Sequence, residues 1–197
     1  MSHNNSSVNK LARATAKAQR PICIWMTGLS GSGKSTIANM LECRLHENGF
    51  HTYWLDGDTL REGLNSDLGF SDVDRHENIR RTAQVARLMV DAGLIAIVSF
   101  ISPFQADRTF ARSLFENHEF CEVFIDAPID ECVRRDPKGL YAKAINGQLL
   151  NFTGISGAYE APEYPDIHLY TQIESPEDSV DKLFKVLNQK INEDKSS

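Results

Sequence analysis

Short hydrophobic runs alternate along this chain with longer segments in which hydrophobic residues recur at helical spacing. The uninterrupted runs at 22–27, 52–55, 94–100 and 121–125 predict strands that are buried on both faces. A further strand is expected at 167–170, after a long polar interval. Because strands that alternate with helices pair in parallel, the pattern predicts an α/β fold, with a parallel β-sheet and helices on both of its faces.

The clearest helical pattern covers about 72–92. Hydrophobic residues mark one face of this segment at Ile79, Ala83, Ala86 and Val90. Ser71, with Asp74 three residues later, supplies an N-terminal capping signal, and Gly93 follows the end. These signals predict a long amphipathic helix with defined ends.

The two ends of the chain differ in pattern. We expect 1–20 to be a flexible N-terminal extension of a single domain at 21–197. The basic, Ala-rich part at 10–20 is also compatible with a short helix over the core or with a linker scar, and the sequence does not decide among the three. At the other end, Ser175 followed by Pro176 and acidic residues predicts the start of a terminal helix.

The alternation of strands and helices stops between about 136 and 165. Turn-forming residues mark this segment at Asp136-Pro137-Lys138-Gly139, Asn151-Phe152-Thr153-Gly154, Pro162 and Pro165. A long polar interval inside a compact domain is typical of a lid that closes over substrates. A disordered insertion is the alternative, but the aromatic and basic residues within the segment favour a contact surface.

Length and charge limit the classes of function. At 197 residues the chain suits one α/β domain that buries a sizeable core. Its formal net charge of -6 argues against general binding to nucleic acid or to anionic membranes, which usually needs a basic face. An anionic substrate must therefore be held by a local group of arginines and lysines.

The cysteines and the hydrophobic stretches bear on where the chain works. Cys23, Cys43, Cys121 and Cys132 have neither metal-ligand spacing nor the density of a secreted disulfide scaffold. No hydrophobic stretch approaches the length of a membrane span, and the N-terminus lacks the apolar segment of a secretory signal. We therefore expect reduced cysteines, no membrane contact and a cytoplasmic location.

A complete G-x-x-x-x-G-K-S phosphate-binding motif directly follows the first predicted strand. The predicted ATP-binding residues are Gly28, Leu29, Ser30, Gly31, Ser32, Gly33, Lys34, Ser35 and Thr36. The glycines let backbone N–H groups surround phosphate oxygens, Lys34 reaches the β- and γ-phosphates, and the Ser35 hydroxyl can bind Mg²⁺. A helix over about 35–46 would point its positive end at the same phosphates. The alternative, a turn that merely joins strand to helix, is disfavoured because every motif position is filled.

A second group of polar residues, Asp56, Asp58 and Arg61, directly follows the second predicted strand. Ligands of parallel α/β proteins lie at this end of the sheet. Asp58 can accept a proton from a substrate hydroxyl or orient Mg²⁺, and Arg61 can bind an anion. The alternative is that Asp56 or Asp58 simply caps a short helix that begins near Thr59.

Further motifs follow in order along the chain. They are Gly69-Phe70-Ser71, Asp74 to Arg81, Ser99 to Phe104, Arg135 to Tyr141, and Asn151 to Ile155. Together with the phosphate-binding loop and Asp56-Gly57-Asp58, they resemble adenylylsulfate kinase (APS kinase) from about 20 to about 170. The resemblance implies a P-loop NTPase-type fold and the phosphorylation by ATP of the 3′-hydroxyl of adenosine 5′-phosphosulfate (APS), which gives 3′-phosphoadenosine 5′-phosphosulfate (PAPS) in sulfate assimilation.

The resemblance also implies roles for individual residues. The APS-binding set it implies is Asp56, Asp58, Arg61, Phe70, Arg75, Asn78, Ile101, Ser102, Lys143 and Phe152. Within this set, Arg61, Arg75 and Asn78 would hold the phosphosulfate and sugar. Phe70 and Phe152 would stack on the adenine, although core packing is the alternative for either ring taken alone. Lys143 would add charge near the transferred phosphoryl group, and Ile101 would lend backbone contacts.

The catalytic residues expected are Lys34, Asp58 and Ser102, with Mg²⁺ held by Ser35 and Asp58. Ser102 matches a serine often assigned as a phosphorylated intermediate in this family. A hydroxyl without a neighbouring base is a poor nucleophile, so we favour direct transfer with Ser102 shaping the acceptor pocket. The adenine of ATP is placed near Arg135 on fold analogy alone.

The chain departs from the family pattern at two positions. Gln105 stands where the family usually has Arg, and Ala158 stands where it usually has Pro before Tyr159. The first change is expected to remove a positive charge near the acceptor, and the second to loosen the lid. Because neither touches the phosphate-binding loop, we expect altered affinity or regulation more than lost activity.

Two other functions remain as alternatives. One is a small P-loop kinase with a different acceptor, against which the motifs from Phe70 to Arg81 and from Asn151 to Ile155 argue. The other is a non-catalytic nucleotide switch, against which the retained Lys34, Ser35 and Asp58 argue. Family members commonly form homodimers, so a homodimer is expected. The sequence does not show whether the chain works beside, or fused to, the ATP sulfurylase that makes APS.

Overall fold

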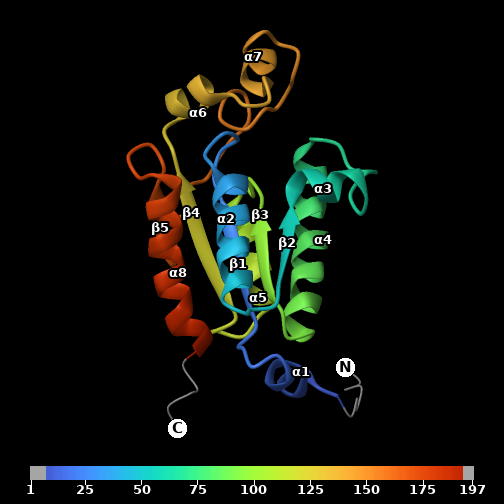
Figure 1. Ribbon diagram of the computed structural model, residues 1–197. Coiled ribbons are helices and arrows are strands. Elements are labelled where there is room, and N and C mark those ends of the chain that lie inside the picture. The colour runs from blue at the N-terminus through green and yellow to red at the C-terminus, as the bar shows by residue number, and fades with distance from the viewer. Residues whose placement is uncertain (1–7, 193–197) are drawn as a thin grey trace.

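The computed structural model describes residues 8–192, which form a five-stranded parallel sheet with helices on both faces (Figure 1). The strands are β1 (Ile22–Thr27), β2 (Thr52–Asp56), β3 (Ile95–Ser99), β4 (Phe120–Asp126) and β5 (Ile167–Tyr170). Their order in the sheet is β2-β3-β1-β4-β5, and every neighbouring pair is parallel. The predicted α/β fold class is confirmed, and each predicted strand lies within two residues of its expected bounds.

Eight helices are described. They are α1 (Lys10–Ala16), α2 (Lys34–Glu47), α3 (Gly57–Glu62), α4 (Asp72–Asp91), α5 (Gln105–Ser113), α6 (Ile129–Arg135), α7 (Leu140–Ile145) and α8 (Pro176–Asn192). The predicted caps are confirmed, because the Ser71 side chain accepts from Asp74 N and Ser175 Oγ accepts from Asp178 N at 3.1 Å. Local capping chemistry therefore fixes where the two longest helices begin.

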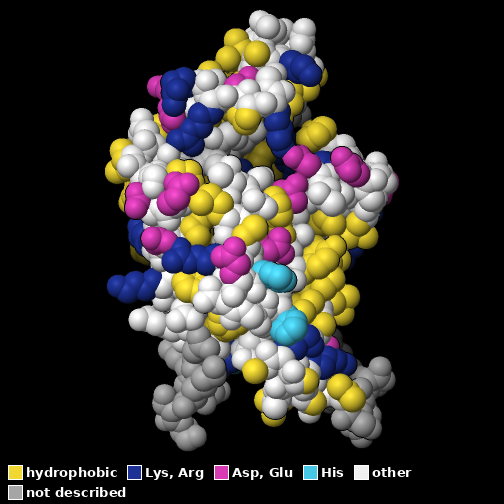
Figure 2. All heavy atoms as spheres, viewed as in Figure 1, with side chains coloured by type: hydrophobic (Ala, Val, Ile, Leu, Met, Phe, Trp, Pro, Cys, Tyr) yellow, Lys and Arg dark blue, Asp and Glu magenta, His cyan; other side chains and the backbone are white. Residues whose placement is uncertain are grey.

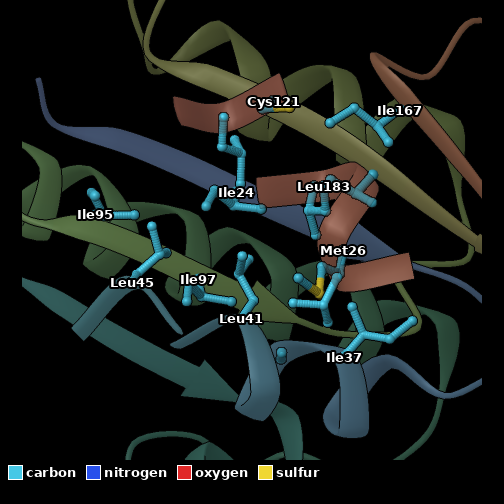
Figure 3. Close-up of a cluster of buried hydrophobic side chains, with 14 of the residues drawn as sticks. Ile24, Met26, Ile37, Leu41, Leu45, Ile95, Ile97, Cys121, Ile167 and Leu183 are labelled. Carbon is cyan, nitrogen blue, oxygen red and sulfur yellow. The ribbon is translucent and has the colours of Figure 1, made fainter. Parts of the chain in front are cut away.

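One face of the sheet is covered by α2 and α8. Alternate residues of β1, Ile24 and Met26, point to this face and pack against Leu41 of α2 and Leu183 of α8 (Figure 3). All four side chains have no exposed surface. The hydrophobic effect at this layer, about 25 cal/mol per Å² of apolar surface buried, holds the helix that carries the phosphate-binding loop against the sheet.

The opposite face is covered mainly by α4. Trp25 of β1 points to this side and packs in a cluster with Ile79 and Ala83 of α4. Because β1 lies at the centre of the sheet, its residues are buried on both faces, which explains its uninterrupted hydrophobic sequence.

The parallel arrangement brings the carboxyl ends of all strands to one edge. The loops after β1, β2 and β3 meet at this edge, beneath α6 and α7 (Figure 1). The segment expected to be a lid, 136–165, rises above the same edge and contains α7. Helix α1 lies at the opposite end of the molecule (Figure 1).

The N-terminal segment differs from the expected flexible extension. Of the alternatives left open for 10–20, the structure has the short helix, α1, followed by a segment tied to the domain. Gln19 is 6% exposed; its Nε2 donates to His51 O and Gly93 O, and its Oε1 accepts from His51 N. These bonds fix 10–20 in place because they join it to two turns between core elements. The part of the expected extension at 1–7 lies outside the described residues.

Two further features concern the cysteines and the lengths of the helices. Cys23, Cys43, Cys121 and Cys132 are free, and all but Cys43 are buried. Within residues 8–192, none of the helices combines the length and hydrophobicity that crossing a membrane requires.

Candidate active site

The phosphate-binding loop joins β1 to α2 at the carboxyl edge of the sheet. Gly28 has a φ of +154°, and a Cβ there would lie 2.3 Å from Ile125 O of β4. Gly33 has a φ of +104° and forms the N-cap of α2. A side chain at either position would therefore strain the loop, and at Gly28 it would also clash with the central sheet. This requirement explains the glycines of the motif in terms of structure as well as phosphate binding.

Lys34 lies at the start of α2 with its ammonium group turned back over the loop. Its Nζ donates to Gly28 O at 2.9 Å and to Leu29 O at 2.7 Å. Burial lowers the pKa of Lys34 to about 8, and the neighbouring Lys138 adds to this, while Asp56 and Asp58 oppose it. The ammonium is therefore a poorly solvated charge that a phosphate would stabilise.

Asp56 is the carboxylate in contact with Ser35. Its Oδ1 accepts from Ser35 Oγ at 3.3 Å and from Ser99 Oγ at 2.9 Å. Its Oδ2 accepts from Asp58 N at 3.1 Å, which caps α3. Asp56 therefore has two structural roles. It caps the short helix α3, and it presents a carboxylate beside the phosphate-binding loop.

Asp58 makes a different contact. Its side chain is 65% exposed and forms an ion pair with Lys138 from the start of the lid segment. Lys138 lines the same cavity, whereas Lys143, the lid lysine expected at the transferred phosphoryl group, is exposed on α7 and lies outside the cavity lining. Among the described residues the turn at 136–139 thus directs Lys138, rather than Lys143, toward the cavity.

Two arginines extend the site away from the phosphate-binding loop. The Arg61 guanidinium stacks over the Phe70 ring at 4.5 Å, and its Nη1 donates to Gly69 O at 3.0 Å. Arg75 is 9% exposed; its Nε donates to Phe70 O at 3.1 Å and its Nη2 to Asn151 O at 2.9 Å. Burial lowers the pKa of both guanidinium groups, which therefore form a partly desolvated positive centre.

Asn78 lies one turn after Arg75 on the buried face of α4. Its Oδ1 accepts from Asn65 Nδ2 at 2.6 Å, which fixes the amide orientation. Asn65 Oδ1 has no hydrogen-bond partner within residues 8–192. No sequence motif marks Asn65, because a single asparagine in a turn is indistinguishable from an ordinary turn residue.

Ile101 and Ser102 belong to the loop between β3 and α5. Ser102 has a φ of +39°, which is unusual for a residue with a side chain. Its hydroxyl is buried and accepts from Trp25 Nε1 at 3.2 Å, and Thr27 Oγ1 donates to Ile101 O at 2.7 Å. The Ser102 hydroxyl thus faces the indole of Trp25, and no basic side chain has a described contact with it.

The base of the lid contacts the phosphate-binding loop directly. Tyr141 of α7 donates from its hydroxyl to Ser30 O at 2.9 Å, and its ring meets Phe152 edge-on at 5.0 Å. Arg135 of α6 donates to Thr171 O at 2.5 Å and to Gly31 O at 3.3 Å. The hydrogen bonds of Tyr141 and Arg135 therefore join the start of the lid segment and the end of α6 to the phosphate-binding loop.

These residues surround one cavity of about 1200 Å³. The predicted site residues that line it are Ser30, Gly31, Gly33, Lys34, Ser35, Thr36, Asp56, Asp58, Arg61, Phe70, Arg75, Asn78, Ile101, Ser102, Arg135 and Phe152. Those outside its lining are Gly28, Leu29, Ser32 and Lys143. Figure 2 shows basic and acidic side chains gathered at the level of the lid and just below it. The phosphate-binding loop and the two arginines thus face one space that exceeds the usual size of a single-ligand pocket.

Sequence reasoning missed several lining residues. The main ones are Lys138, Leu149, Leu150, Thr153, Thr171 and Glu174. The signal available for Lys138 was its place in the motif that begins at Arg135. Thr171 had none, because it follows the last strand without a motif, yet its Oγ1 donates to Ser32 O at 2.7 Å.

The two departures from the family pattern both lie outside the cavity lining. Gln105 begins α5, and its backbone N donates to Glu160 Oε2 at 2.6 Å. The expectation that Gln105 removes a charge from the acceptor site is therefore not supported by its position. Ala158 precedes Tyr159, whose hydroxyl contacts Thr27 Oγ1 at 3.1 Å. Burial raises the pKa of Tyr159 to about 12.

Comparisons with known proteins agree on one family. The family described as adenylylsulphate kinase matches residues 20–170. The adenylyl-sulfate kinase of Aeromonas hydrophila is 55% identical over 185 residues, which cover 94% of each chain. The bifunctional enzyme NodQ of Rhizobium sp. (strain N33) is 62% identical over 183 residues, and this chain spans 28% of its length.

A solved structure gives the same result. The Mycobacterium tuberculosis APS kinase CysC, in complex with AMPPNP and APS, is 46% identical to this chain and superposes with a TM-score of 0.82. The match covers 86% of this chain and 98% of that one. The family match at 20–170 includes the five strands, the phosphate-binding loop and the whole segment 136–165.

Proposed function

The chain belongs to the adenylylsulphate kinase family, and from that membership we propose that it phosphorylates APS. In this reaction the 3′-hydroxyl oxygen of APS bonds to the γ-phosphorus of ATP, the bond to the β,γ-bridging oxygen breaks, and PAPS, ADP and a proton are released. The observation that carries the proposal is the single cavity lined by both Lys34 and the pair Arg61 and Arg75. Two anion-binding groups across one cavity suit two phosphate-bearing substrates.

The donor site is formed by the loop 28–35 and α2. Backbone N–H groups of the loop and the positive end of α2 would bind the phosphates of ATP. Lys34 would exchange the carbonyl oxygens of Gly28 and Leu29 for the β- and γ-phosphate oxygens. Because the ammonium is already desolvated, this exchange favours a charged ligand over water.

The residues beside the loop fit Mg²⁺. Ser35 and Asp56 present a hydroxyl and a carboxylate in contact with one another, and hard oxygen ligands of this kind suit that ion. We therefore assign Asp56, rather than the expected Asp58, as the carboxylate that joins Ser35 in holding Mg²⁺. When bound, the ion would neutralise charge on the transferred phosphoryl group.

The acceptor site is formed by Arg61, Arg75 and Asn78, with Phe70 and Phe152 at its sides. The described contacts of Arg75 use Nε and Nη2, so its Nη1 group is available to an anion among the residues that the structure describes. Phe70 is 60% exposed, and the Arg61 guanidinium already stacks on its ring. An exposed aromatic at a cavity wall suits base stacking, which contributes about 1–3 kcal/mol per base.

Transfer is proposed to be direct. Asp58 would orient the 3′-hydroxyl and accept its proton, with Lys138 holding the carboxylate in place. The Ser102 hydroxyl is buried against Trp25, which supports a role in shaping the pocket rather than in carrying a phosphoryl group. Catalysis would then rest on positioning and charge neutralisation.

The experiment that tests the function measures ADP release from ATP and Mg²⁺ with and without APS, and identifies PAPS as the second product. We expect ADP only when APS is present. Lys34→Ala and Asp58→Ala should lower kcat by at least about a hundredfold, within the range for lost charge stabilisation or acid–base catalysis. Arg75→Ala should mainly raise the KM for APS, and Lys185→Ala, at an exposed position of α8 outside the cavity lining, serves as the control. APS-independent ADP release, or nucleotide binding without turnover, would contradict the proposal.

We also propose a homodimer in the cytoplasm that acts with ATP sulfurylase as the source of APS, on the basis of the family resemblance. The chain spans less than a third of the length of the NodQ relatives that it matches. The four free cysteines are compatible with a reducing compartment. Light scattering after size-exclusion chromatography measures the assembly directly.

A further inference from the structure

Arg108 is a buried arginine of α5 that the proposed reaction does not use. The residue is 3% exposed, and its guanidinium donates in three directions. Nε donates to Glu122 Oε1 of β4 at 2.9 Å, Nη1 to Ser102 O at 2.8 Å, and Nη2 to Glu160 O at 2.7 Å. One rigid fork therefore joins the sheet to two segments that are far apart in the sequence.

The first of these segments is the acceptor loop, residues 100–104, which contributes Ile101 and Ser102 to the cavity. Ser102 holds a φ of +39°, and a strained backbone of this kind persists only where its surroundings fix it. Two donors fix the carbonyl groups here, because Thr27 Oγ1 bonds to Ile101 O and Arg108 Nη1 bonds to Ser102 O.

The second segment is the lid root, residues 158–160, where the lid segment returns toward the sheet. Glu160 N donates to Pro103 O at 2.8 Å, and Glu160 Oε2 accepts from Gln105 N at 2.6 Å. Tyr159 contacts Thr27 at the end of β1. The lid root and the acceptor loop are therefore bonded to one another as well as to Arg108.

We propose that Arg108 is a positioning residue that holds the acceptor loop and the lid root as one unit, so that the APS pocket keeps its shape only while the lid root is attached. The inference rests on the proposed function, since it assigns the effect to the APS side of the reaction. Arg108 itself lies outside the cavity lining, so it would not contact either substrate directly. Its effect on APS is exerted through Ser102 O and Glu160 O.

Arg112, one turn further along α5, provides a matched control. It also pairs with Glu122, at 3.4 Å, and with Asp166 at 2.7 Å. Its described contacts include neither the acceptor loop nor the lid root. Replacing the Arg112 guanidinium therefore alters the same helix and a contact with the same carboxylate, that of Glu122. It leaves the bonds of Arg108 to the acceptor loop and to the lid root in place.

The test compares Arg108→Lys with Arg112→Lys in the full chain. Lysine keeps the charge that faces Glu122 but cannot reach three acceptors that diverge from a planar fork. We expect Arg108→Lys to raise the KM for APS at least fivefold while the KM for ATP stays within twofold, and Arg112→Lys to change neither. Hydrogen exchange of the backbone, measured without substrates, should accelerate at 101–105 and 158–160 in Arg108→Lys alone.

Tyr159→Phe is a second variant that keeps the ring and removes one contact of the lid root. We expect Tyr159→Phe to raise the KM for APS selectively, as Arg108→Lys does, but by a smaller factor. An unchanged KM for APS in both variants, or equal rises for APS and ATP, would overturn the proposal. Unaltered hydrogen exchange in Arg108→Lys would do the same. Failure of the proposed function is recognised separately, because wild-type protein would then form no PAPS while the exchange experiment still reports on Arg108.

Discussion

At the scale of a single residue, the buried ammonium group of Lys34 is the feature of the site that depends most directly on pH. Its ammonium is bonded to two carbonyl groups of the loop, and burial lowers its pKa to about 8. In the proposed complex the phosphates of ATP would favour the charged form, so binding above pH 8 would take up a proton. The pKa thus links nucleotide affinity to pH.

We predict that the affinity for a non-hydrolysed ATP analogue weakens as the pH rises above about 8, by up to about tenfold per pH unit. The sign follows because the free protein loses the Lys34 proton near pH 8, whereas the complex retains it to higher pH. Calorimetric titrations at pH 7 to 9.5 in buffers of different ionisation enthalpy measure both the affinity and the proton uptake. Lys34→Arg is the control, since a guanidinium stays charged and should remove the pH dependence. Proton uptake that persists in Lys34→Arg would contradict the assignment.

Ser102 gives a second prediction at this scale. Its hydroxyl accepts from the buried Trp25 indole, so Ser102→Ala should destabilise the protein by about 1–3 kcal/mol through the unpaired N–H group. Direct transfer needs no serine nucleophile, so kcat should fall by less than about tenfold. Urea unfolding and PAPS formation measure the two effects. Ser113→Ala, at an exposed end of α5, is the control. A folded Ser102→Ala protein without turnover would favour a phosphorylated serine.

At the scale of an element, the lid segment illustrates how one turn selects between two lysines. Lys138 follows Pro137 in the turn before α7 and pairs with Asp58, whereas Lys143 points to solvent from α7 itself. Gly139, in the left-handed conformation with a φ of +64°, ends this turn and begins the helix. Because α7 then runs in the direction set by this turn, Lys143 lies outside the cavity lining.

We predict that Lys138→Ala lowers kcat/KM for APS at least about tenfold, while Lys143→Ala changes it less than about twofold. Each variant removes one charge from the same segment, so a general charge effect would act equally on both. The melting temperature should change little in either, because an exposed ion pair contributes about 0–1 kcal/mol. Steady-state kinetics with APS varied at saturating ATP measure the difference. A larger effect at Lys143 would indicate that the lid changes its orientation when substrates bind.

At the scale of the whole molecule, the site and the N-terminal helix lie at opposite ends of the sheet (Figure 1). Gln19 joins the segment after α1 to the turns that precede β2 and β3. These turns are at the amino ends of the strands, far from the phosphate-binding loop. Stability and catalysis can therefore be altered independently at the two ends.

We predict that Gln19→Ala lowers the free energy of unfolding by about 2–4 kcal/mol, because it removes the three hydrogen bonds that the buried Gln19 side chain makes to His51 and Gly93. The melting temperature should fall by roughly 5–12 °C for a chain of this size. The kcat and both KM values should stay within about twofold of wild type, which steady-state assays at 20 °C can check. Arg13→Ala, which removes an exposed ion pair from α1, should have a much smaller effect on stability. An equal loss of stability in Arg13→Ala would show that the Gln19 bonds are unimportant.

The sequence alone determined the features that depend on local chemistry and on periodicity. Buried strands such as β1 are hydrophobic on both faces, so the run at 22–27 predicted a buried strand correctly. The glycines and Lys34 of the phosphate-binding loop are required within a few consecutive residues, and they were recognised for that reason. Helix α4 was predicted from its cap at Ser71 and from one hydrophobic face, both of which are local signals.

Only the tertiary structure decided which distant residues meet. Neighbouring carboxylates such as Asp56 and Asp58 point in different directions from the end of a strand, and the contact with Ser35 of α2 selects Asp56. The choice of Lys138 over Lys143, and the three acceptors of Arg108, depend in the same way on the angles at which loops leave the sheet. A sequence pattern carries no record of those angles, because they result from long-range packing rather than from the order of neighbouring residues.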